Sequence, residues 1–135
     1  MNSSAPEELT EFVRSQALLY PAILAVYLFG SHSTEKAKPD SDLDLALLLQ
    51  PGRESDFPLL ELAVSLEKAL GLKADMVILN RAGELLKYQV RRFGRLLYDR
   101  DPRSRKQFEV RGRKSFEDFL YLHRRYLGQV SRKTT

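Results

Sequence analysis

Cysteine is absent from this chain of 135 residues. The protein therefore has no disulfide scaffold, no thiolate metal site and no thiol nucleophile, which is compatible with a reducing cytosol. No apolar run approaches the roughly 18 residues of a membrane span. The N-terminus also lacks the basic and apolar regions of a signal peptide. We therefore expect a cytoplasmic protein that does not enter a membrane.

Charge is distributed unevenly along the chain. Residues 1–80 carry six Lys and Arg against twelve Asp and Glu, a net −6, whereas residues 81–135 carry 16 against six, a net +10. The basic half could contact nucleic acid, nucleotide phosphates or an acidic protein, or it could be solvated helix surface. There is no zinc-finger signature, no glycine-rich RNA signature and no aromatic ladder in a strand. Direct nucleic-acid binding is therefore not expected.

The length and the apolar spacing predict one α/β (or α+β) domain over residues 1–135, with a small mixed sheet of three or four strands flanked by helices. Its core is expected over residues 5–100 and a polar helical region over 101–130. Strands are predicted at 22–29, 43–49, 73–79 and 96–98, and helices at 9–20, 59–70 and 80–92.

Turn and capping residues suggest where the helices begin and end. Asp56 and Asn80 are expected to cap the second and third helices, and Gly128 is expected to mark the end of the last one. The tyrosines of the basic half are expected to pack on amphipathic faces; they are Tyr88, Tyr98, Tyr121 and Tyr126.

Two aspartates stand at the start of a strand that is otherwise apolar. Asp42 and Asp44 are separated by one residue, so on a strand both side chains project from the same face. Two carboxylates at that distance repel each other. An isolated pair of this kind most often ends a turn and faces water. Alternatively, it holds Mg²⁺, which prefers oxygen ligands and is often bound by one or two carboxylates plus substrate phosphates.

Two other features are ordinary alone and informative in company. Gly30-Ser31 after a strand is a common turn, but glycine also allows a phosphate to approach the backbone, and Ser31 offers a hydroxyl. Asp75 is the only acid in its strand, where a lone aspartate commonly marks a strand end. With Asp42 and Asp44 it could hold two metal ions that orient a triphosphate and stabilise a leaving pyrophosphate.

The joint pattern is Gly30-Ser31, ten residues, Asp42-Leu43-Asp44, and then Asp75 on the next strand. It closely resembles the Gly-Ser, ten residues, Asp-x-Asp signature of the minimal nucleotidyltransferases of the polymerase-beta superfamily. The resemblance covers nearly the whole chain and is nearest to the MNT antitoxins, the partners of HEPN toxins, which are typically RNases. It implies a polymerase-beta-like fold and an enzyme that transfers AMP from ATP to a tyrosine of the toxin, which silences it.

The same resemblance implies a role for each residue of the pattern. Gly30 and Ser31 would bind the triphosphate, and Asp42 and Asp44 would hold the metals, Mg²⁺ in two copies. Asp75 would be the third acid of this metal-binding and catalytic set, positioned to act on the attacking hydroxyl.

The loop departs from the family pattern at two positions. His32 and Glu35 stand where the family often has arginine and glycine, and Glu35 is expected to face solvent because an inward acid would repel the triphosphate. Two other functions remain open: a nucleotidyltransferase for a small molecule or an RNA end, and a non-catalytic antitoxin that inhibits by binding alone. The chain lacks a second domain for an acceptor pocket, which argues against the former. A pure binder gains nothing from three crowded acids, which argues against the latter.

Overall fold

The structure, a computed structural model, describes residues 7–30 and 42–134. Its elements follow the order α1 (Glu7–Leu19), β1 (Ile23–Phe29), β2 (Leu43–Leu49), α2 (Leu59–Leu70), β3 (Ala74–Ile78), a 3-10 turn η2 (Leu79–Arg81), α3 (Glu84–Phe93), β4 (Arg95–Asp99) and α4 (Pro102–Thr134).

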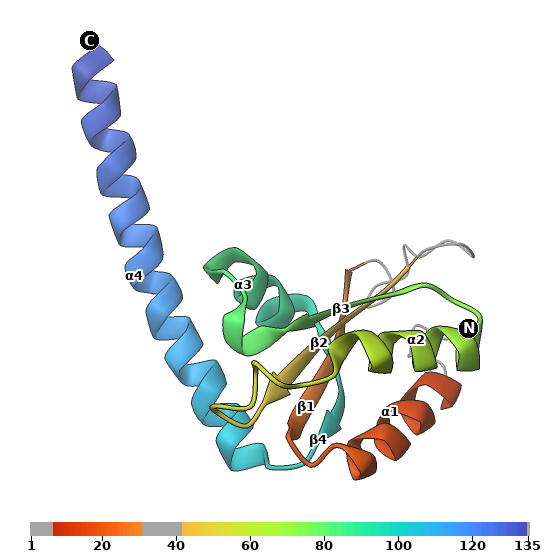
Figure 1. Ribbon diagram of the computed structural model, residues 1–135. Coiled ribbons are helices and arrows are strands. Elements are labelled where there is room, and N and C mark those ends of the chain that lie inside the picture. The colour runs from red at the N-terminus through yellow and green to blue at the C-terminus, as the bar shows by residue number, and fades with distance from the viewer. Residues whose placement is uncertain (1–6, 31–41, 135) are drawn as a thin grey trace.

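The four strands form one mixed sheet in the order β3-β2-β1-β4 (Figure 1). β1 lies antiparallel to both β2 and β4, and β2 lies parallel to β3. The helix α2 provides the crossover that a parallel pair requires. The predicted fold, a small mixed sheet flanked by helices, is confirmed.

Helices cover both faces of this sheet. On one face Leu9 of α1 and Leu62 of α2 join alternate residues of β1 and β2 in a buried cluster. On the other face Val90 of α3 and Phe108 of α4 pack against a second cluster that includes Tyr27 and Ala46. Strands that are buried on both faces read as continuous apolar runs, which explains why β1 and β2 lack a polar alternation.

Two predicted helix caps are wrong. Asp56 does not cap α2, whose first turn receives no side-chain hydrogen bond. Asn80 does not cap α3, which begins later, at Glu84. Its side-chain amide instead extends β2: the Leu49 N–H donates to Asn80 Oδ1 and Asn80 Nδ2 donates to the Leu49 carbonyl, both at 2.9 Å. An asparagine amide carries the donor and acceptor that such a strand end needs.

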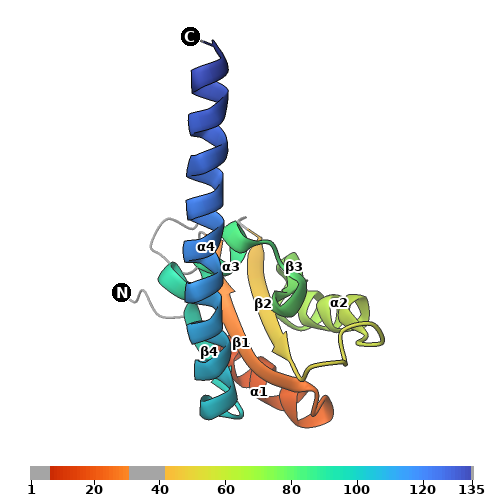
Figure 2. The same cartoon turned by 90° about the vertical axis from the view of Figure 1, so that its left-hand side faces the viewer.

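The last helix is longer than expected. α4 continues through Gly112 and Gly128 to Thr134, so the predicted end at Gly128 is wrong. An interior glycine costs a helix about 1 kcal/mol relative to alanine, which weakens the helix without breaking it. The 33 residues of α4 span about 50 Å at 1.5 Å per residue. Figure 2 shows the second half of α4 extending past the other helices and strands.

A polar cluster, here called the α4 clamp, fixes the start of this helix to the sheet. The Tyr27 hydroxyl of β1 donates to Glu109 at 2.7 Å. Arg105 donates to the same carboxylate at 3.0 Å and to Asp99 of β4 at 2.8 Å. Burial of Tyr27, followed by its hydrogen bond to Glu109, raises the pKa of this hydroxyl well above its ordinary value, so it remains a donor.

Candidate functional site

Asp44 and Asp75 are neighbours at one end of the sheet, where β2 and β3 begin. The parallel register pairs Asp44 of β2 with Asp75 of β3, and adjacent strands lie about 4.8 Å apart. The next pair on the same face, Ala46 with Val77, belongs to the core beneath α3. Asp44 is half-buried and Asp75 is exposed. The two carboxylates therefore stand at the open end of the face that α3 covers.

Asp42 lies directly before β2 and is exposed. Leu43, between the two aspartates, donates its N–H to the carbonyl of Lys73 at 2.8 Å and buries its side chain in the core on the opposite face. Because side chains alternate along a strand, Asp44 lies on the face opposite Leu43, and it remains a prediction that Asp42 shares this face.

Gly30 directly follows β1 and lies next to Asp44. Its neighbour Phe29 pairs with Asp44 in the antiparallel register. The φ of Gly30 is +74°, in the left-handed region that glycine adopts readily. A Cβ atom at this position would collide with the carboxylate of Asp44, whose Cγ would lie only 3.1 Å away. The backbone at Gly30 therefore lies directly against one of the predicted metal ligands.

Ser31, His32 and Glu35 lie outside the described residues, so their predicted roles and orientations remain predictions. Within residues 7–30 and 42–134, no group of three His, Asp or Glu side chains is close enough to hold one metal ion. The adjacent pair Asp44 and Asp75, with Asp42 two residues along, nevertheless supplies the carboxylate oxygens that Mg²⁺ prefers. The donor set fits this ion.

A glutamate that the sequence analysis did not single out contacts the same end of the sheet. The N–H of Ala74, directly before Asp75, donates to Glu67 Oε2 at 3.0 Å. Glu67 belongs to α2 and is half-buried. It fixes the first residue of β3 and thereby the backbone that carries Asp75. Nothing local marks it, because a glutamate near the end of an amphipathic helix is ordinarily surface.

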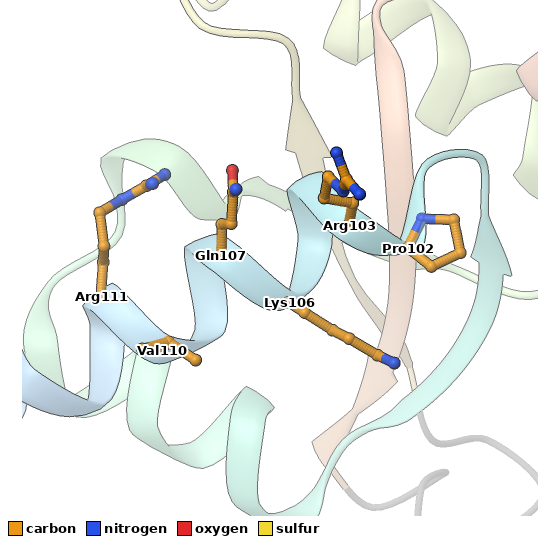
Figure 3. A pocket seen from close by; sticks show the side chains of 6 residues that line it. All are labelled: Pro102, Arg103, Lys106, Gln107, Val110 and Arg111. Carbon is orange, nitrogen blue, oxygen red and sulfur yellow. The ribbon is translucent and has the colours of Figure 1, made fainter.

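A shallow hollow of about 770 Å³ lies elsewhere, on the first turns of α4 (Figure 3). It is lined by Pro102, Arg103, Lys106, Gln107, Val110 and Arg111. α4 follows β4, whose last residue Asp99 pairs with Ala25 near the start of β1. The hollow is therefore near the end of the sheet where β1 begins, whereas Gly30 lies at the end where β1 finishes, and none of the predicted site residues line it.

The family model for polymerase beta nucleotidyltransferases matches residues 7–103. The chain belongs to this nucleotidyltransferase family. The matched segment includes β1, β2 and β3 and ends where α4 begins. It confirms the family that the spacing of Gly30, Asp42 and Asp44 suggested. No curated protein matches this nucleotidyltransferase, and no helix in its described part is long and apolar enough to cross a membrane.

Solved structures resemble the nucleotidyltransferase over most of its length. A chain of a toxin–antitoxin complex with AMP-PNP aligns with a TM-score of 0.72 and 24% identity, covering 97% of this chain and 99% of that one. A chain from the complex of tri-AMPylated Shewanella oneidensis HEPN toxin with MNT antitoxin aligns with a TM-score of 0.67 and 25% identity, covering 93% of this chain and 99% of that one. A protein assigned as a minimal nucleotidyltransferase aligns at 0.53 and 31%, covering 70% and 94%.

Proposed function

We propose that this nucleotidyltransferase is an antitoxin that transfers AMP from ATP to a tyrosine hydroxyl of a HEPN-type toxin and so inactivates it. The observation that carries the proposal is the contact between the Gly30 backbone and the Asp44 carboxylate, beside Asp75. It joins a turn suited to phosphate with carboxylates suited to a divalent cation. The similar structures that contain AMP-PNP or an AMPylated HEPN toxin support the same chemistry.

Phosphate binding falls to the turn after β1. The left-handed conformation of Gly30 leaves the backbone without a side chain that would exclude an oxygen anion. Ser31, the next residue in the sequence, supplies a hydroxyl and a backbone N–H for the triphosphate. A phosphate held at Gly30 would lie beside the carboxylate of Asp44.

The aspartates hold Mg²⁺ and handle the proton of the acceptor. Asp42, Asp44 and Asp75 supply the oxygen ligands, and the pairing of β2 with β3 holds two of them on rigid strands. When bound, the ion neutralises these acids and polarises the α-phosphate. Asp75 is exposed and takes the proton of the attacking hydroxyl, whose oxygen then displaces pyrophosphate from the α-phosphorus.

The acceptor comes from outside the chain. Asp42 and Asp75 are both exposed, and the hollow on α4 lies near the other end of the strands. The hollow on α4 and the two small hollows inside the core are lined by described residues other than Asp42, Asp44 and Asp75. A folded partner that presents a hydroxyl would complete the site.

The test is intact-mass spectrometry of a HEPN-type toxin that forms a complex with this nucleotidyltransferase, after incubation of the two proteins with ATP and Mg²⁺. The partner should gain AMP in whole units of about 329 Da, as transfer with loss of pyrophosphate requires. Asp42→Ala combined with Asp44→Ala should abolish the gain and leave the complex intact. Asp56→Ala, an exposed aspartate without a cap role, is the matched control and should transfer AMP normally.

Two outcomes would replace the proposal. A partner that is inhibited without any gain of mass would indicate an antitoxin that acts by binding alone. Transfer of AMP to an RNA end or to a small molecule, with the partner unmodified, would indicate the other enzymatic function.

A further inference from the structure

The second half of α4 carries an apolar stripe that begins inside the domain and continues beyond it. At its inner end Phe116 stacks on Tyr88 of α3 with 4.5 Å between ring centroids. Phe119 follows at 5.9 Å from Phe116, and His123 lies at 5.9 Å from Phe119. α3 covers the inner end of the stripe, and Figures 1 and 2 show α4 continuing past it without another element alongside.

Beyond His123 none of the described helices and strands covers the stripe. Residues 119–134 of α4 are here called the free arm. At 3.6 residues per turn, Phe119, Leu122 and Tyr126 fall on one side of the helix, and Leu127 borders them. Leu122 is 63% exposed, Tyr126 62% and Leu127 51%. Apolar stripes on helices are ordinarily buried, and an isolated helix of this length is marginal in water. A binding partner would bury the stripe and stabilise the helix that carries it.

The charge of the free arm restricts what can cover it. From residue 119 to the end of the chain there are four cations, Arg124, Arg125, Arg132 and Lys133, and no Asp or Glu. Two copies of such a segment would repel each other, which disfavours self-pairing. A nucleic acid would need the cations but not the leucines. The combination suits an apolar groove bordered by carboxylates on another protein, the arrangement by which such grooves accept amphipathic helices.

We infer that the free arm is the docking site for the toxin, which covers the apolar stripe with an apolar groove and faces the arginines with acidic side chains. This inference rests on the proposed function for the identity of the partner. It adds that docking and chemistry use separate surfaces. The arm supplies affinity, and the aspartates at the end of the sheet act on the hydroxyl that docking brings to them.

The experiment measures the affinity of the same HEPN-type toxin for the wild type and for three variants by isothermal titration calorimetry. Leu122→Glu and Leu127→Glu place a carboxylate in the stripe and should each weaken binding by on the order of 30-fold, as the loss of an interface anchor does. Leu60→Glu is the matched control, because this leucine is 77% exposed and belongs to α2, which lies away from the second half of α4 (Figure 1). Its affinity should be that of the wild type.

Hydrogen exchange gives a second measurement that does not depend on any variant. Amides of residues 119–134 should exchange rapidly in the free nucleotidyltransferase and become protected when the toxin is added. Protection confined to other elements, or unchanged affinity in both stripe variants, would overturn the inference. So would a wild-type protein that dimerises alone and becomes monomeric as Leu122→Glu, because the occupant would then be a second copy.

The two proposals fail in different ways. A wild-type complex without AMP transfer, weakened by Leu122→Glu, removes the chemistry and leaves the docking site. If the wild type transfers AMP, and Leu122→Glu and Leu127→Glu both transfer AMP and bind the toxin as tightly as the wild type, the docking site is wrong and the chemistry stands. Weaker binding on Arg124→Ala together with Arg125→Ala, without any effect of the stripe variants, would indicate a polyanion and contradict the inference.

Discussion

At the scale of single residues, the site depends on space that only a glycine leaves. Gly30 and Gly52 both have positive φ, +74° and +87°. A Cβ at Gly30 would meet the Asp44 carboxylate, whereas a Cβ at Gly52 would meet nothing within 4 Å. The two glycines therefore separate the cost of the backbone conformation from the cost of displacing the aspartate.

We predict that Gly52→Ala loses about 1–2 kcal/mol of stability, the cost of a left-handed alanine, and that Gly30→Ala loses at least as much, because its Cβ also forces the Asp44 side chain to rotate away. Only Gly30→Ala should lose AMP transfer, since that rotation removes a metal ligand and narrows the phosphate turn. Urea unfolding gives the stabilities, and calorimetry of ATP with Mg²⁺ gives the binding. Full activity in Gly30→Ala would separate the glycine from the site.

The residues of the site differed in how well the sequence could indicate them. Gly30, Asp42 and Asp44 could be singled out from the sequence because phosphate and metal chemistry require particular residue types at a fixed spacing around a strand, and their roles stay predictions. The pairing of Asp75 with Asp44 agrees with the predicted company of the three acids, whose catalytic roles remain predictions. Glu67 could not be found, because its partner is the backbone N–H of Ala74, a contact that exists only after α2 packs beside β3.

At the scale of elements, the α4 clamp decides how the last helix leaves the sheet. Tyr27 is only 4% exposed, and its hydroxyl joins β1 to Glu109 of α4. We predict that Tyr27→Phe lowers stability by about 1–2 kcal/mol, because the half-buried carboxylate of Glu109 loses a hydrogen-bond donor. Tyr98→Phe is the control, since this half-buried tyrosine contacts Arg100 through its ring face, and its effect should stay within about 0.5 kcal/mol. Chemical denaturation measures both.

The pH dependence of this difference has a definite sign. The pKa of Tyr27 is raised in the folded protein, first by burial and then by Glu109. A raised pKa contributes stability that is fully present below the unfolded value, about 10 for tyrosine, and is lost as pH rises above it. The stability gap between wild type and Tyr27→Phe should therefore be constant near neutral pH and shrink above about pH 10. A gap that grew in alkali would contradict the assigned hydrogen bond.

Element positions were predicted better than element ends. β2 (Leu43–Leu49) begins and ends as expected, because apolar runs between turn residues are a strong signal. The end of α4 was placed at Gly128, although a glycine ends a helix only when the chain also turns away there. Tyr88 and Tyr98 pack as predicted, but Tyr121 and Tyr126 are exposed. An amphipathic pattern shows that a face is apolar, not whether this chain covers it.

At the scale of the whole molecule, the order of helices and strands was enough to predict the architecture, because two strands buried on both faces need helices on each side. The direction of α4 was not predictable. It is set by the α4 clamp, which joins residues as distant in sequence as Tyr27 and Glu109. The exposure of the free arm was equally unpredictable, because the apolar spacing of its stripe in the sequence is the same as that of the part that packs on α3.

The carboxylates of the proposed metal site should lower the stability of the whole protein when no metal is bound. Asp44 and Asp75 are register neighbours, and without a cation their like charges oppose folding. We predict that Asp44→Asn melts at the wild-type temperature or higher without metal, a gain of up to about 1 kcal/mol. Mg²⁺ with ATP should raise the midpoint of the wild type but not that of Asp44→Asn, because binding to the native state stabilises it.

Asp101→Ala is the contrast: Asp101 accepts hydrogen bonds from the backbone and hydroxyl of Ser104 at 3.2 and 2.7 Å, so its loss should lower the midpoint in every condition. A clear fall for Asp44→Asn without metal would give Asp44 the same structural role as Asp101 and remove it from the proposed metal site.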